Sequence, residues 1–94
     1  MDGAQPRGDA AIDFSTFILS VSTSAVTYLG LIAHPETGEA TLNLTLAKQN
    51  IDILSMLREK TVGNLTGDEA KLLETLLYDL RMRFLEISQA KRRA

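Results

Sequence analysis

The chain has 94 residues, of which 45% are hydrophobic and 23% charged, and its formal net charge is −2; this is the composition of one globular domain. It has no cysteine and only one histidine, so disulfides, thiolate metal sites, cysteine nucleophiles and sites with several imidazole ligands are excluded. We expect no cofactor and no metal. The lack of a broad cationic surface also argues against nucleic acid as a partner.

Residues 1–12 combine glycine and proline with charges of both signs and few large apolar groups, so we expect a disordered leader. Its acidic residues, placed just before the first apolar run, do not suit a secretory signal. We therefore expect a cytoplasmic protein. Residues 13–90 are predicted to form a single helical domain, and residues 91–94 a basic C-terminal tail. Cations there complement the dipole at a helix C-terminus and require no anionic partner.

The first predicted helix begins after Asp13, a favoured N-cap residue, and runs to about Gly30. The fold class that we predict is all-α, with three such helices in one domain. No residue from Phe14 to Ala33 carries a formal charge. A solvent-facing helix normally uses Lys and Glu, which are better helix formers than Ser and Thr.

At about 100° per residue, the first helix has two opposed faces. One is apolar and comprises Phe14, Phe17, Ile18, Val21, Ala25, Tyr28, Leu29 and Ile32. The other, here called the hydroxyl face, comprises Thr16, Ser20, Thr23, Ser24 and Thr27, with Leu19 and Val26 as a narrow strip beside it. Small hydroxyl residues suit close helix approach, and their hydroxyls can bond the carbonyl one turn back.

A short β-hairpin is predicted between the first two helices, over residues 31–42. Pro35-Glu36-Thr37-Gly38 suits a type I turn followed by a left-handed glycine, with short apolar stretches on both sides. A lone hairpin is barely stable in water and needs packing or a partner strand. His34 lies at the mouth of the turn, where we interpret it as a surface residue.

The second predicted helix runs from about Leu44 to Thr61, with Asn43 as its cap and Gly63-Asn64 as its stop. It is amphipathic, and its predicted buried arc comprises Leu46, Ala47, Ile51, Ile53, Leu54 and Leu57.

The third predicted helix opens on a capping box, with Thr66 at the cap and Glu69 three residues on, and reaches about Gln89. Its core face comprises Leu72, Leu73, Leu76, Leu77, Leu80, Phe84 and Ile87. A second apolar stripe, Tyr78, Met82 and Leu85, lies among polar residues on the nominal solvent side. Such a stripe suggests that another helix packs there.

Three interpretations of the uncharged first helix compete. It is long enough to cross a bilayer, but seven Ser or Thr residues dilute it and no nearby Lys, Arg or Trp anchors it. It could be buried within one three-helix domain. We favour the third interpretation, an oligomeric helical bundle, because the first and third helices each carry a surplus uncharged face. The predicted oligomer interface comprises Thr16, Leu19, Ser20, Thr23, Ser24, Val26, Thr27, Tyr78, Met82 and Leu85.

The favoured function is that of a small self-associating module that binds or scaffolds a protein partner. The alternative is binding of a small ligand or a membrane surface through the first helix. Catalysis is least favoured, because the mid-helix hydroxyls lack an activating base and the sequence has no glycine-rich phosphate loop or spaced ligand cluster. We therefore predict no enzyme and name no catalytic residue.

Seven short runs carry a family pattern in order and spacing: Asp13 to Ser20, Leu29 to Ile32, Pro35 to Glu39, Leu46 to Gln49, Ile51 to Leu54, Gly63 to Thr66 and Leu77 to Arg81. In these runs the chain resembles a family of short bacterial proteins catalogued as domain of unknown function 1844. The resemblance covers about Asp13 to Ser88. Thr45 departs from it, because members often have proline there. The resemblance implies a bacterial cytoplasmic protein and supplies no activity or site residues.

Overall fold

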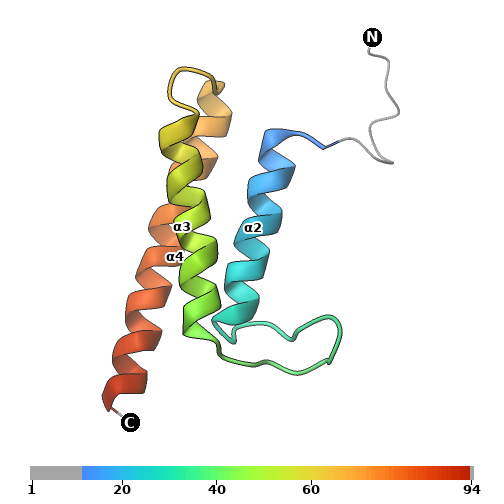
Figure 1. The fold of residues 1–94 in the computed structure, drawn as a ribbon, viewed down its shortest axis with the longest axis vertical. Helices are drawn as coiled ribbons and strands as arrows, with labels where there is room; N and C mark the ends of the chain where they lie inside the picture. Colours follow the sequence, from blue (N-terminus) through green and yellow to red (C-terminus); the bar gives the residue numbers. More distant parts are fainter. Residues whose placement is uncertain (1–11, 94) are drawn as a thin grey trace.

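A computed structural model describes residues 12–93 of the chain. They form three helices, α2 (Phe14–Tyr28), α3 (Leu44–Lys60) and α4 (Gly67–Arg93), so the all-α prediction is confirmed. Successive helices run in opposite directions along one long axis (Figure 1). All three pairs of helices are in contact and surround a single core. The predicted leader lies outside the described residues, apart from Ile12.

Each helix begins where its cap was predicted. The side chains of Asp13 and Asn43 accept hydrogen bonds from the backbone N–H groups three residues on, at 2.8 and 3.0 Å, which satisfies donors that a helix start leaves unpaired. The capping box of α4 is reciprocal: the Glu69 N–H donates to the Thr66 hydroxyl at 3.1 Å, and the Thr66 N–H donates to the Glu69 carboxylate at 2.9 Å.

The core is a narrow column between the three helices. Its buried hydrophobic residues are Ile18, Ala25, Leu29, Ala47, Ile51, Leu54, Leu73, Leu77 and Leu80. Ser22 is also buried, on the same face of α2 as Ile18 and Ala25. Ile53 was predicted in the buried arc of α3, but its side chain is 37% exposed, because it lies on the flank of the helix turned away from Ala47 and Leu54.

Helix α4 is longer than its neighbours and extends past the start of α3 (Figure 1). Its last fully buried residue is Leu80, and after it Phe84 and Ile87 are only half-buried. The helix passes the predicted end near Gln89 and continues to Arg93, so the three cations 91–93 form its last turn. In that position they complement the negative end of the helix dipole.

The predicted β-hairpin is absent from the described residues. The segment 31–42 is a loop whose pairing is limited to one isolated antiparallel bridge, Leu29 with Leu42. Gly30, at φ +77°, ends α2 in a Schellman motif: its N–H donates to the Thr27 carbonyl, and the Leu31 N–H donates to the Val26 carbonyl. This reversal turns the chain back toward α2, so that residues 32–35 lie against the last turns of that helix and do not continue as a paired strand.

Candidate functional site

The exposed part of the hydroxyl face occupies the first three turns of α2. Thr16, Leu19, Ser20 and Thr23 are all exposed. The hydroxyls of Ser20 and Thr23 donate to carbonyl oxygens one turn back, Ser20 to Phe17 at 2.8 Å and Thr23 to Leu19 at 3.0 Å. Because these donors are satisfied within the helix, the face offers methyl groups and oxygen lone pairs to a partner.

The remainder of the hydroxyl face is covered by the chain itself. Thr27 is only 8% exposed, and its hydroxyl donates to the Thr23 carbonyl at 2.8 Å. Ser24 is half-buried, and Val26, in the strip beside this face, packs against the hydrophobic core. The loop after Gly30 lies over this end of α2. Thr27 and Val26 were predicted at an oligomer interface, but in this chain they already have intramolecular neighbours.

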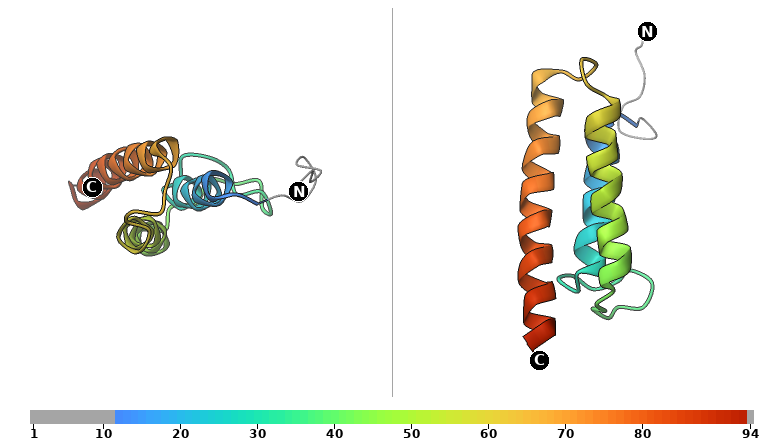
Figure 2. Two further views of the ribbon diagram at one scale, coloured as in Figure 1. Left: turned by 90° about the horizontal axis from the view of Figure 1, so that it is seen from above. Right: turned by 60° about the vertical axis from the view of Figure 1, so that its left-hand side comes forward.

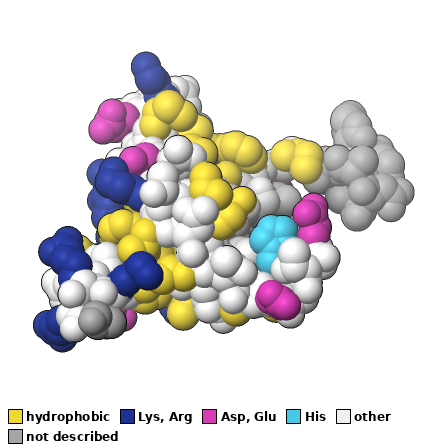
Figure 3. Space-filling view, turned by 60° about the horizontal axis from the view of Figure 1, so that its bottom comes forward, with side chains coloured by type: hydrophobic (Ala, Val, Ile, Leu, Met, Phe, Trp, Pro, Cys, Tyr) yellow, Lys and Arg dark blue, Asp and Glu magenta, His cyan; other side chains and the backbone are white. Residues whose placement is uncertain are grey.

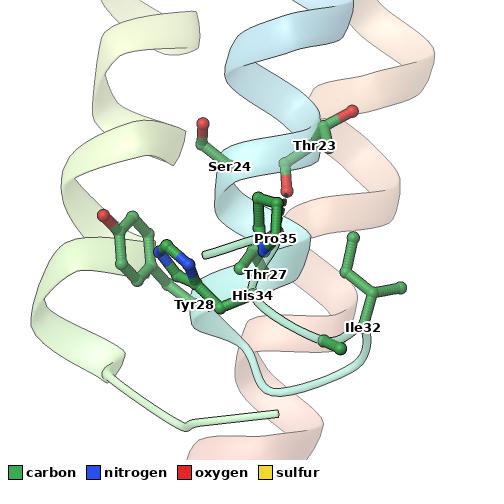
Figure 4. Close-up of a pocket in the computed structure, with 8 residues that line it drawn as sticks. Thr23, Ser24, Thr27, Tyr28, Ile32, His34 and Pro35 are labelled. Atoms are coloured by element: carbon green, nitrogen blue, oxygen red, sulfur yellow. Dashed lines mark hydrogen bonds between the residues drawn. The ribbon is translucent and has the colours of Figure 1, made fainter. Parts of the chain in front are cut away.

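A hollow of about 360 Å³ lies where the loop folds over α2 (Figure 4). Hydroxyl residues of the helix line one wall and loop residues the other: Thr23, Ser24, Thr27, Tyr28, Ile32, Ala33, His34 and Pro35. The last turns of α2 and the first residues of the loop thus meet in one concave surface. No sequence pattern indicated this hollow, because it depends on the path of the loop.

His34 organises the loop through three hydrogen bonds. Its N–H donates to the Glu39 carbonyl at 2.9 Å, and its carbonyl accepts from the Gly38 N–H at 2.8 Å. Its Nδ1 accepts from the Glu36 N–H at 3.2 Å, so in the neutral ring Nε2 carries the proton. Gly38 takes the expected left-handed conformation, at φ +74°. The imidazole is therefore a structural element of the turn as well as part of the hollow.

The second stripe of α4 is exposed. Tyr78 is 70% exposed, Met82 42% and Leu85 50%, and all three lie on the side of α4 turned away from Leu77 and Leu80. Exposed apolar side chains clustered in this way are more informative than scattered ones. In a view from the bottom of the molecule, hydrophobic side chains lie between the Lys and Arg side chains near the end of α4 (Figure 3).

The two predicted surfaces do not meet. Seen from above, α2 and α4 lie on different sides of the molecule (Figure 2). Because both helices turn their buried residues toward the shared core, the hydroxyl face and the stripe lie on different outer sides. One flat partner surface cannot cover both. The ten predicted interface residues therefore divide into two separate surfaces, one on each helix.

Other apolar side chains are exposed at positions that the sequence patterns did not predict. Met56 on α3 is exposed, as are Leu31 and Ile32 in the loop. A groove of about 280 Å³ also lies between α3 and α4, lined by Lys48, Ile51, Asp52, Arg81, Phe84 and Leu85. Leu85 thus belongs both to the stripe and to the edge of this groove.

Residues 12–93 contain no group of three or more His, Asp or Glu side chains placed to hold a metal ion. Among the same residues, no helix has both the length and the apolar character required to cross a membrane. The uncharged segment is divided in the structure, since α2 ends at Tyr28 and the residues after Gly30 belong to the loop.

The comparisons with known proteins give one result. No curated protein and no solved structure matches the chain. The family model described as "Domain of unknown function (DUF1844)" matches residues 11–86, a span that begins just before α2 and ends within α4. It includes the three caps, the loop and the exposed stripe. The chain therefore belongs to the DUF1844 family.

Proposed function

We propose that this protein self-associates through the exposed stripe of α4 and serves as a small interaction module for a protein partner in the cytoplasm. The observation that carries the proposal is the exposure of Tyr78, Met82 and Leu85 at helical spacing on one face. No catalytic step and no nucleic-acid contact form part of it. Neither a metal nor a cofactor is invoked.

The balance of buried and exposed apolar residues supports association. The described residues bury nine hydrophobic side chains and leave twelve large ones exposed. A domain of this length buries a modest share of its surface, and oligomerisation is a common way to add to it. Covering exposed apolar surface contributes about 25 cal/mol per Å² before the cost of association is subtracted. Three adjacent apolar side chains therefore form a plausible centre for an interface.

The test is the solution mass, measured by light scattering over a range of concentrations. We expect the wild type to exceed the mass of one chain, and Met82→Glu to return it to a monomer. Ala90→Glu is the matched control, because Ala90 is exposed on the same helix but lies outside the stripe. A wild-type monomer at high concentration would end the proposal. If Met82→Glu and Ala90→Glu lower the solution mass equally, the stripe is not the surface through which the protein self-associates.

Two further variants, measured in the same way, test the hydroxyl face of α2. Ser20→Glu and Thr23→Glu place a charge on this face, where both residues are exposed. If α2 forms a second contact, these variants reduce a larger assembly to the species held together by α4. If their mass equals that of the wild type, α2 takes no part in self-association.

A second candidate function is supported by the hollow beside His34. Its wall combines four hydroxyl-bearing residues, Thr23, Ser24, Thr27 and Tyr28, with an imidazole, a lining that suits a small ligand with polar groups. Nuclear magnetic resonance with a library of small polar compounds tests it. Shifts confined to Ser24, Thr27 and His34 would support binding there. If no compound changes the chemical shifts of these residues, or if the changes are scattered over the surface, this candidate is excluded.

A further inference from the structure

We propose that two copies of the chain pair antiparallel along the outer side of α4, with the midpoint of the helix, near Leu80, at the two-fold axis. This inference rests on the proposed self-association and adds the orientation, the register and the residues that face one another. In this pair, α4 of the second copy packs against the exposed stripe of the first.

The stripe is the centre of a longer seam. Residues that alternate four and three positions apart continue it along the whole of α4, which is the spacing of a coiled-coil contact. We call this set the outer seam, and it comprises Asp68, Lys71, Thr75, Tyr78, Met82, Leu85, Gln89 and Arg92. All eight residues are exposed. Helix α4 therefore has two lengthwise contact lines, one used in the core and one open.

A hollow beside the outer seam gives the contact a receiving surface. It is a shallow depression on the surface of α4 itself, lined by Glu74, Thr75, Leu76, Tyr78 and Asp79. In coiled-coil packing, each apolar knob of one helix enters a hole formed by residues of the other. Antiparallel pairing about the midpoint places Met82 and Leu85 of the second copy opposite Tyr78 and Thr75, at this hollow.

The charges at the ends of the outer seam select the antiparallel orientation. Asp68 lies at one end and Arg92 at the other. Antiparallel pairing places them opposite each other, twice by symmetry, whereas parallel pairing places like charges together. The rest of α4 has the same polarity. Residues 67–79 hold four acidic residues and one basic residue, and residues 80–93 hold five basic residues and one acidic residue.

Charges near the two-fold axis are held by the chain itself. Asp79 flanks the outer seam and accepts a hydrogen bond from the Arg83 side chain at 2.9 Å, so two copies of Asp79 can approach as neutral pairs. Arg81, on the other flank, donates to the Ser55 hydroxyl of α3 at 3.0 Å. That contact draws its guanidinium toward α3 and away from the outer seam.

Introduced cysteines test the register directly, because the native chain contains none. Lys71 and Gln89 are exposed and lie opposite each other in the proposed pair. We would mix Lys71→Cys chains with Gln89→Cys chains that carry a size tag, in a glutathione redox buffer. A disulfide requires Cα atoms within about 7 Å. The expected product is the mixed dimer, because two Gln89→Cys residues in an antiparallel pair are separated by about 27 Å.

The outcomes separate this inference from the proposed function. Mixed dimers support the antiparallel pair. Same-variant dimers alone would show a parallel pair and overturn it. If wild type and variants have the mass of a dimer but no disulfide forms, the outer seam is not the contact, while self-association stands. If the wild type is a monomer at high concentration, both fail.

A charge exchange at the seam ends gives an independent measurement. Asp68→Arg should weaken dimerisation about 10-fold, because two opposite-charge contacts become repulsive. Adding Arg92→Asp in the same chain should restore the dissociation constant to within about 3-fold of the wild type. Its helix is less stable, because both charges then oppose the dipole. If the second substitution weakens association further, the antiparallel register is wrong.

Discussion

Leu29 and Leu42 form an isolated antiparallel bridge that brings the two ends of the long loop together. The Asn43 N–H reinforces it by donating to the Tyr28 carbonyl at 2.7 Å. The end of α2 and the cap of α3 are thereby fixed to each other. The loop between them is closed by backbone contacts, and its path over α2 begins from a constrained point.

The left-handed glycine at this junction is the first site where a substitution has a definite expected effect. Gly30→Ala should lower the free energy of unfolding by about 1–2 kcal/mol, because φ is +77° and an alanine there is strained. Gly67→Ala is the control: a Cβ there meets nothing within 4 Å and no positive φ is involved. Urea unfolding of both variants measures the difference. Equal stabilities would contradict the assigned role of Gly30.

The capping box of α4 makes a second prediction. Thr66→Ala should cost about 1 kcal/mol, because it removes the acceptor for the Glu69 N–H. Thr66→Ser retains a hydroxyl and should recover most of that loss. Thr45→Ala, in the exposed first turn of α3, should change stability by less than about 0.5 kcal/mol. Thermal and urea unfolding should rank the three variants in this order, and a neutral Thr66→Ala would contradict it.

The covered hydroxyl of Thr27 is expected to be dispensable. It donates to the carbonyl of Thr23, which also accepts the helical backbone bond, so Thr27→Val leaves no unpaired group. We expect a stability change within about 0.5 kcal/mol. Thr27→Glu should cost about 2 kcal/mol or more, since it buries a charge beneath the loop. A large loss with valine would indicate that the hydroxyl has a further partner.

The inner and outer sides of α4 should respond to truncation in opposite ways. Leu77→Ala should lower the free energy of unfolding by about 2–5 kcal/mol, because Leu77 is fully buried in the core. Met82→Ala should leave the stability of dilute protein nearly unchanged and should weaken self-association. Unfolding at low concentration, combined with sedimentation, separates the two effects. A large loss of dilute-state stability from Met82→Ala would show that its role lies within one chain.

The sequence predicted the elements that depend on local chemistry. The caps at Asp13, Asn43 and Thr66 obey rules that involve only the next three residues. The left-handed conformations of Gly38 and Gly63 are equally local. The existence and the starts of all three helices followed from these signals and from apolar periodicity.

The hairpin was predicted wrongly because the end of α2 at Gly30 was not recognised as a reversal of the chain. Apolar residues around Pro35 favoured a hairpin, but the reversal at Gly30 brings Ile32 over α2 instead. The same reversal covers Thr27, which the face count had placed toward solvent or a partner. The stripe of α4 could be identified from spacing alone, whereas its separation from the hydroxyl face required the packing of the helices.

The uneven burial of α4 gives one helix two different stabilities. Leu73, Leu77 and Leu80 hold the first part of the helix in the core, so we expect the amide hydrogens around them to exchange only when the whole domain unfolds. Beyond Ser88 the side chains are exposed in a single chain, so we expect the last turns to open locally. A second copy lying along α4 would protect those turns, so that protein concentration itself would set how much of the helix is ordered.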